Sequence, residues 1–210
     1  MKKYTFLMLV GVMGIATNLA AQNAGGRHIL SAAAGMNLFQ HFGWVSNSYS
    51  ELNTVNLKIK GTPAYGIAYD YGITPWFSLG VAGAYSNFTF IADQIVVPRE
   101  LKGTYVGPID LGMSRVSVGL RPLMHYGHLH RFDMYSGLRL GANIWTTGLT
   151  SAADLLPEEV DSFLRSTSTS FNFQVIPFGL RGYVTPNFAI GFETGFGAPH
   201  YAALQLSYRM

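Results

Sequence analysis

Seven charged residues stand in segments where large apolar residues alternate with small or polar ones. They are Asp70, Arg115, Arg121, Arg139, Arg181, Glu193 and Arg209. Each falls on the face made of glycine, alanine, serine and asparagine. Charges enclosed by protein must be paired or wet, so the set predicts a network of ion pairs that fills an interior. Because five arginines face only two acids, an arginine-lined path for a small anion stays open as a second interpretation.

Three histidines cluster in the sequence HYGHLH, at positions 125, 128 and 130. Neutral imidazoles at such close spacing are suitable ligands for a transition metal. Asp133 is the one acid nearby, the chain has no cysteine, and exposed histidines are common in turns. We therefore expect no metal and no cofactor, and His125, His128 and His130 are weak metal candidates only.

No serine, histidine and aspartate stand at a spacing that defines nucleophilic catalysis. His41, Asp93 and His200 are isolated in the sequence, near the end of the molecule where the long connections lie. Only the fold would bring them together. We expect no enzyme, and a lipid-modifying enzyme is the most distant of the alternatives.

Eight segments with a period of two hold these residues, as expected of β-strands. They span about 28–40, 62–73, 77–91, 110–125, 132–146, 169–183, 188–197 and 201–210. The phase breaks at 175–177, which predicts a β-bulge, because Pro177 cannot donate to a strand ladder. The connections at 74–76, 126–131, 185–187 and 197–200 are short, whereas those at 41–61, 92–109 and 147–168 are long.

The composition decides which face meets which solvent. Charged residues make up 12% of the chain and aromatic residues 14%, whereas a soluble domain usually carries about 25% charged residues. A soluble lipocalin-like barrel would need lysine and glutamate on its outer face. Here the face opposite the large apolar residues consists mainly of small residues. Small residues suit the interior of a narrow barrel, and large apolar ones suit lipid. The sequence thus predicts an all-β fold, an eight-stranded antiparallel transmembrane barrel with short periplasmic turns and longer extracellular loops.

Aromatic residues of such a barrel gather at the two water interfaces. We assign this role to Tyr71, Trp76, Phe77, Phe188 and Tyr208 near the short turns, and to Trp145 near the long loops. In the third long loop, residues 151–165 (SAADLLPEEVDSFLR) predict one short helix, since Pro157 suits a first helical turn. Its acids, among them Glu158 and Glu159, leave a calcium- or partner-binding surface as an alternative to a solvated helix.

The first 21 residues predict a secretory signal peptide cut near Ala21, with Lys2 and Lys3 before a short apolar core. The barrel domain then covers residues 22–210, and we expect no further domain. Two of the 14 basic residues belong to the signal, so basic residues nearly balance the 11 acidic ones in the remainder. We therefore expect no nucleic acid as a partner.

The strand spacing, the hairpin IPFGLRGYVTPNFAIGFETGFG (176–197) and the closing strand YAALQLSYRM with Tyr208 carry a family resemblance. From about residue 27 to 210 the chain resembles the small OmpA/OmpX-type outer-membrane β-barrels of Gram-negative bacteria. Such barrels commonly end in an aromatic residue, whereas this chain ends in Met210.

The resemblance implies an integral outer-membrane protein that meets outer-membrane lipids, lipopolysaccharide and the outer-membrane assembly machinery. It implies a structural or surface-interaction role, with loops 41–61, 92–109 and 147–168 as the contact surface for an extracellular partner. A narrow channel for small anionic or amphipathic solutes is the first alternative function.

Overall fold

The computed structural model describes residues 25–37, 57–96, 104–126, 131–149 and 165–210. This part of the chain holds nine strands, all paired antiparallel: β1 (His28–Met36), β2 (Leu57–Gly61), β3 (Ala64–Thr74), β4 (Phe77–Val96), β5 (Thr104–Tyr126), β6 (Phe132–Leu149), β7 (Ser166–Tyr183), β8 (Phe188–Gly197) and β9 (Ala202–Arg209). Within the described ranges, no helix is long and apolar enough to cross a membrane.

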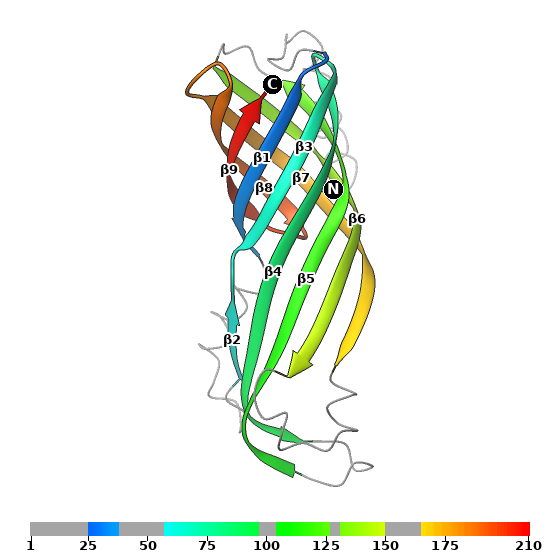
Figure 1. Ribbon diagram of the computed structural model, residues 1–210, viewed down its shortest axis with the longest axis vertical. Helices are drawn as coiled ribbons and strands as arrows, with labels where there is room; N and C mark the ends of the chain where they lie inside the picture. Colours follow the sequence, from blue (N-terminus) through cyan, green and yellow to red (C-terminus); the bar gives the residue numbers. More distant parts are fainter. Residues whose placement is uncertain (1–24, 38–56, 97–103, 127–130, 150–164) are drawn as a thin grey trace, which may run out of the picture.

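Eight of the strands form a closed ring (Figure 1). The order around it is β4-β3-β1-β9-β8-β7-β6-β5, and β5 pairs back onto β4. β2 continues the line of β3 and pairs with the outer part of β4. A closed ring leaves no strand edge unpaired, which a structure in lipid requires. The predicted eight-stranded antiparallel barrel is confirmed.

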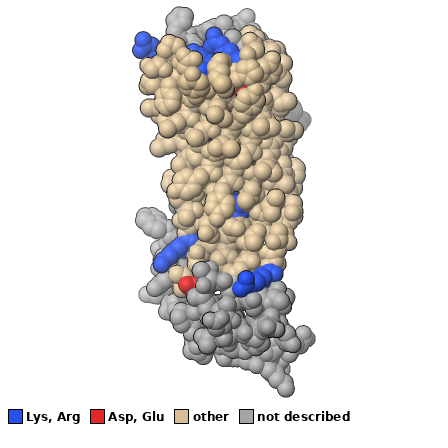
Figure 2. All heavy atoms as spheres, viewed as in Figure 1, with Lys and Arg blue, Asp and Glu red and all other residues tan. Residues whose placement is uncertain are grey.

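The two faces of the barrel differ as the alternation predicts. In β8, for example, Phe188, Ile190 and Phe192 are exposed, whereas Ala189 and Glu193 are buried. Described charged residues that are not buried lie near strand ends (Arg27, Lys60, Arg131, Arg165 and Arg209) or, for Asp110, beside the stretch of β4 that pairs with β2. Figure 2 shows the result, a broad belt nearly free of charge between two charged ends. The outside is therefore an apolar belt, as expected of a surface in contact with lipid.

The two ends of the barrel, the turn rim and the loop rim, differ in the connections that they carry. The turn rim carries the connections after β3, β5 and β7, the start of β1 and the C-terminal residue, where Met210 exchanges backbone hydrogen bonds with His28. The loop rim carries the other connections, including residues 198–201 between β8 and β9. Figure 1 shows the turn rim at the top.

Strands at the loop rim run further than the sequence indicated. β4 reaches Val96 and β5 starts at Thr104, β6 reaches Leu149 and β7 starts at Ser166, and residues 57–61 form β2. The predicted loops 41–61, 92–109 and 147–168 are therefore partly strand, and the boundaries were wrong. On β7 the reason is visible, because Ser166 to Ser170 are polar and exposed on both faces, which hides a period of two.

The predicted bulge is confirmed, since the register of β7 shifts between Val175 and Phe178. Ser136 donates a hydrogen bond of 2.6 Å to the carbonyl of Pro177, so this bulge carbonyl is not left unpaired. The predicted signal peptide and, except for Arg165, the predicted helix at 151–165 lie outside the described residues.

Candidate functional site

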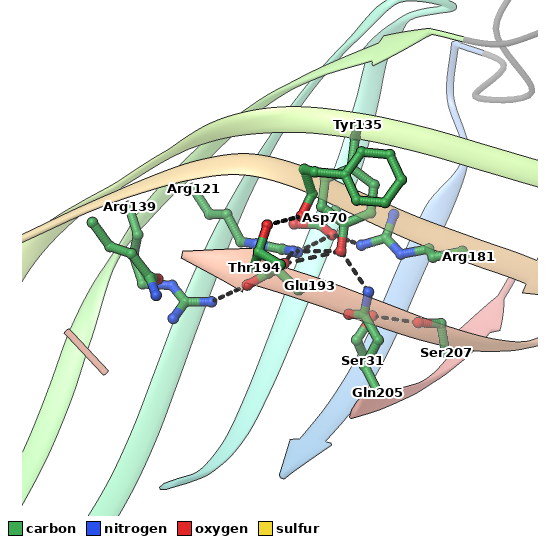
Figure 3. Close-up of polar contacts among 12 residues, drawn as sticks. Ser31, Asp70, Arg121, Tyr135, Arg139, Arg181, Glu193, Thr194, Gln205 and Ser207 are labelled. Atoms are coloured by element: carbon green, nitrogen blue, oxygen red, sulfur yellow. Dashed lines mark hydrogen bonds and ion pairs between the residues drawn. The ribbon is translucent and has the colours of Figure 1, made fainter. Parts of the chain in front are cut away.

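A cluster of ion pairs crosses the lumen between four strands (Figure 3). Arg121 of β5 donates through Nη1 to Oδ2 of Asp70 at 2.6 Å and through Nη2 to Oε2 of Glu193. Arg181 of β7 donates through Nη2 to the same Oδ2 of Asp70 at 2.5 Å. Each of these four side chains is at most 3% exposed. The acids and arginines that the alternation placed inside thus meet across the barrel.

A third acid, Asp133 of β6, completes the cluster. Its Oδ2 lies 3.3 Å from Nη1 of Arg181, and Arg139 reaches Oε1 of Glu193 at 3.4 Å. Three arginines (121, 139 and 181) therefore share three carboxylates (70, 133 and 193), and their charges balance. The sequence reasoning missed Asp133 as a lumen acid, although it alternates with Phe132 and Met134 in the phase of Arg139.

Tyr135 of β6 stands in the middle of this Arg/acid network. Its hydroxyl donates to Oε2 of Glu193 at 2.9 Å and accepts from Gln205 of β9 at 2.5 Å. The guanidinium carbons of Arg181 and Arg121 lie 4.6 Å and 5.3 Å from its ring centroid. A Cβ on Gly179 would lie 2.2 Å from two ring carbons, so the missing side chain is what lets the ring lie against β7.

The lumen around the network has little free space. A cavity of about 20 Å³ is lined by Arg139, Glu193, His200 and Gln205 on one side and by alanine and glycine of β1, β3 and β4 on another. About 10–15 Å³ is needed for one water molecule. This cavity therefore has room for about one water and for no larger solute.

Two of the seven predicted lumen charges lie apart from this network. Arg115 donates to the carbonyl of Pro199 at 2.7 Å and lies near the rings of Phe88 and Trp145. Arg209 lies 4.1 Å from the ring centroid of Tyr183 at the turn rim and donates to the Pro186 carbonyl. Among the described residues neither forms an ion pair with a carboxylate.

The interface aromatics fall into two groups. Tyr71, Trp76, Phe188 and Tyr208 are exposed on the outer face near the turn rim, and Phe77 is half-buried beside them. Trp145 differs, because it alternates with the outward Ile144 and its ring centroid lies 5.2 Å from the guanidinium carbon of Arg115. It belongs to the outer mouth of the lumen and not to the lipid-facing girdle.

The structure gives His125 a role that the sequence did not indicate. Its Nδ1 lies 2.7 Å from Oδ1 of Asp133 and its Nε2 lies 2.8 Å from Oγ of Ser78. This is the contact order of a hydrolytic triad, but Ser78 is 1% exposed and its hydroxyl is closed to an acyl substrate. The arrangement joins β4, β5 and β6 near the turn rim.

The remaining candidates do not assemble a second site. His200 is buried in the lumen with Nε2 3.1 Å from Oε1 of Glu193 and is not exposed at the loop rim. His128 and His130, His41, and the side chain of Asp93 lie outside the described residues. Among described side chains, no group of three potential ligands is placed to hold a metal ion.

Comparison with known proteins finds similar folds and no similar sequence. No family model and no curated protein matches the chain. Among solved structures, OprG of Pseudomonas aeruginosa is 11% identical with a TM-score of 0.50, covering 92% of this chain and 99% of its own. The N-terminal barrel domain of OprF from the same organism is 14% identical with a TM-score of 0.47, and the match covers 89% of this chain and 98% of that domain. Ail of Yersinia pestis, solved with the heparin analogue sucrose octasulfate, is 13% identical with a TM-score of 0.46. That match covers 89% of this chain and 99% of Ail.

The closed ring, the apolar belt and the polar lumen define the class of this protein, and the shared fold of OprG agrees with it. It is a small eight-stranded antiparallel transmembrane β-barrel, a fold that it shares with OprG. Only closed barrels and helices can span lipid, and barrels with this outside and inside are outer-membrane proteins. The chain is accordingly an integral outer-membrane protein.

Proposed function

We propose that this protein is a non-conducting outer-membrane barrel with a structural or surface-interaction role, and not an enzyme. The observation that carries the proposal is the charge-balanced network of three arginines and three carboxylates across the lumen. Eight strands leave an interior just wide enough for side chains, and here those side chains bind one another. The predicted anion path loses support, because Arg121, Arg139 and Arg181 each contact a carboxylate, and only Arg115 is buried in the described lumen without one.

The long strands at the loop rim support a role at the cell surface. β4 has 20 residues and β5 has 23, whereas about 9–11 residues suffice for a tilted strand to span a bilayer. In Figure 1 these two strands extend far beyond the ends of β1 and β9. The wall that they form stands outside the lipid belt and offers a surface, together with loops 41–61, 92–109 and 147–168, for an extracellular partner. Lipopolysaccharide and the other outer-membrane lipids surround the belt, and the assembly machinery inserts the barrel.

The conductance of the folded protein in planar bilayers tests this proposal. We expect no stable current steps above the protein-free bilayer and no faster efflux of chloride from loaded liposomes. Reproducible steps from the unaltered protein would favour the channel for small anionic or amphipathic solutes instead. A lipid-modifying enzyme has no geometric support, because the one Ser–His–Asp arrangement in the described residues is buried.

A shortened variant tests the surface role separately. Replacing residues 95–105 by an Asn-Gly turn joins β4 to β5 directly after the pair Gln94–Val106 and leaves the lipid belt unchanged. We expect this variant to fold and to reach the outer membrane as the full chain does, but to lose binding to surfaces or cells. Unchanged binding would place the contact surface elsewhere.

A further inference from the structure

The connection between β8 and β9, residues 198–201, turns into the lumen instead of away from it. Pro199 and His200 are buried, and His200 is only 4% exposed. The backbone of Tyr201 is tied on both sides, since its N–H donates to Met36 of β1 and its carbonyl accepts from Gly195 of β8, both at 2.9 Å. Tyr201 therefore continues the wall between β1 and β8, while Pro199 and His200 turn inward at the loop rim.

Side chains from other walls hold this segment in place. Arg115 donates to the Pro199 carbonyl at 2.7 Å, and Gln174 of β7 donates to the His200 carbonyl at 2.5 Å. Arg115 stands on β5, which is four strands from β9 in either direction around the ring. Its side chain thus spans the lumen to reach a connection on the opposite wall.

Two glycines leave the room that the segment occupies. A Cβ on Gly35 of β1 would lie 2.8 Å from Cβ of His200. A Cβ on Gly195 would lie 2.3 Å from Nε2 of Gln174, the atom that holds the His200 carbonyl. Real Cβ atoms do not make contacts this short, so the local sequence is matched to the inward conformation.

This segment and the network close the lumen by different means. The network joins three arginines to three acids. The segment is held at Tyr201 by two backbone hydrogen bonds, and at Pro199 and His200 by side-chain donors to their carbonyls and by the His200 contact with Glu193. Arg115 has no carboxylate partner among the described residues, whereas each of the three network arginines contacts at least one carboxylate. The hydrogen bond from Arg115 to the Pro199 carbonyl is charge-assisted through its donor, and it is the contact that ties this segment to the opposite wall.

We propose that residues 198–201 form a lid over the outer half of the lumen, that Arg115 is its latch, and that release of the lid admits small hydrophilic solutes as far as the Arg/acid network. The inference rests on the closed lumen of the proposed function. Directly beneath the lid lie Ala203 and Gln205, which line the small cavity together with Arg139. An open lid would expose these residues while the network still prevents passage.

Cysteine labelling tests the lid, because the chain contains no cysteine of its own. Ala203 is 3% exposed, so Ala203→Cys reports access to the space below the lid. The probe is a small anionic methanethiosulfonate reagent, applied to the folded protein in liposomes. We expect slow labelling of Ala203→Cys alone and at least a tenfold faster rate when Arg115→Met is added, since methionine keeps the packing between Phe88 and Trp145 but donates no hydrogen bond.

Arg209→Met is the matched control, because Arg209 also donates to a proline carbonyl and lies over an aromatic ring, but at the turn rim. It should leave the rate within twofold. Equal rates with Arg115→Met and Arg209→Met would overturn the lid. Heat-modifiable gel migration verifies folding, and Gln174→Met decides the question by the same rate criterion if Arg115→Met does not fold. Ion conduction by the unaltered protein would instead contradict the closed lumen itself.

Discussion

Replacing Glu193 by glutamine tests whether the lumen is a dry, paired network. Glu193 is 2% exposed and contacts Arg121, Arg139, His200 and Tyr135. Glutamine keeps the shape of the side chain and one oxygen, so it creates no cavity. The substitution removes the negative charge and turns one acceptor oxygen into an amide donor. Either Arg121 and Tyr135 or Arg139 and His200 then also face a donor in place of an acceptor.

The expected magnitude follows from the charges that remain. Without Glu193, Arg121 still has Asp70 at 2.6 Å, but Arg139 has no other carboxylate among the described residues. Removing one partner of a buried ion pair typically costs about 3–5 kcal/mol, because the other charge is left uncompensated. We expect Glu193→Gln to lower the free energy of unfolding by about this amount.

The assay is urea-induced unfolding in lipid vesicles, followed by tryptophan fluorescence and by the gel shift between folded and boiled protein. Asp110→Asn is the control, because Asp110 is partly exposed at the loop rim and exposed pairs contribute at most about 1 kcal/mol. Losses below about 1 kcal/mol for both variants would refute the reasoning. They would mean that water screens Glu193 and that the lumen is a wet passage, as in the channel alternative.

Two further substitutions test the packing inside and the lipid outside. Gly179→Ala should clearly lower the urea midpoint of unfolding, because the added Cβ would lie 2.2 Å from the ring of Tyr135. Gly148→Ala should leave the midpoint unchanged, because nothing lies within 4 Å of its added Cβ. Similar midpoints for the two variants would show that the ring moves aside freely. Leu120→Arg, on the lipid-facing side of β5, should lower the free energy of unfolding by about 2–4 kcal/mol. Thr146→Arg, near the loop rim, should lower it by about 0–1 kcal/mol. Equal losses in vesicle unfolding would contradict the position of the apolar belt.

Short-range pattern was enough to predict the strands and their faces. Successive side chains on a strand point to opposite sides, so Leu120 and Arg121 had to face different solvents wherever the strand lay. The small residues beside the arginines then identified the narrow interior. The bulge at Pro177 was predictable for the same reason, because its cause is local to the chain.

The partners inside the lumen were not predictable from the sequence, because they depend on which strands meet after the ring closes. Arg121 contacts Glu193 from 72 residues away, and Arg181 contacts Asp70 from 111 residues away. The stagger of the strands decides which charges share a level, and no local pattern encodes it. Asp133 had the right phase to be noticed, but its contact with Arg181 arises only from the pairing of β6 with β7.

The sequence by itself determined a membrane barrel with its charges inside. The alternation decides on which face of a strand each side chain lies, and the composition of each face decides whether that face meets lipid or the lumen. Tertiary structure alone decided that three acids balance three arginines, that His125 and His200 are buried, and that Pro199 and His200 turn into the lumen. The physical reason is the same in each case. A side chain's face is set by its immediate neighbours, whereas its partner is set by closure of the whole ring.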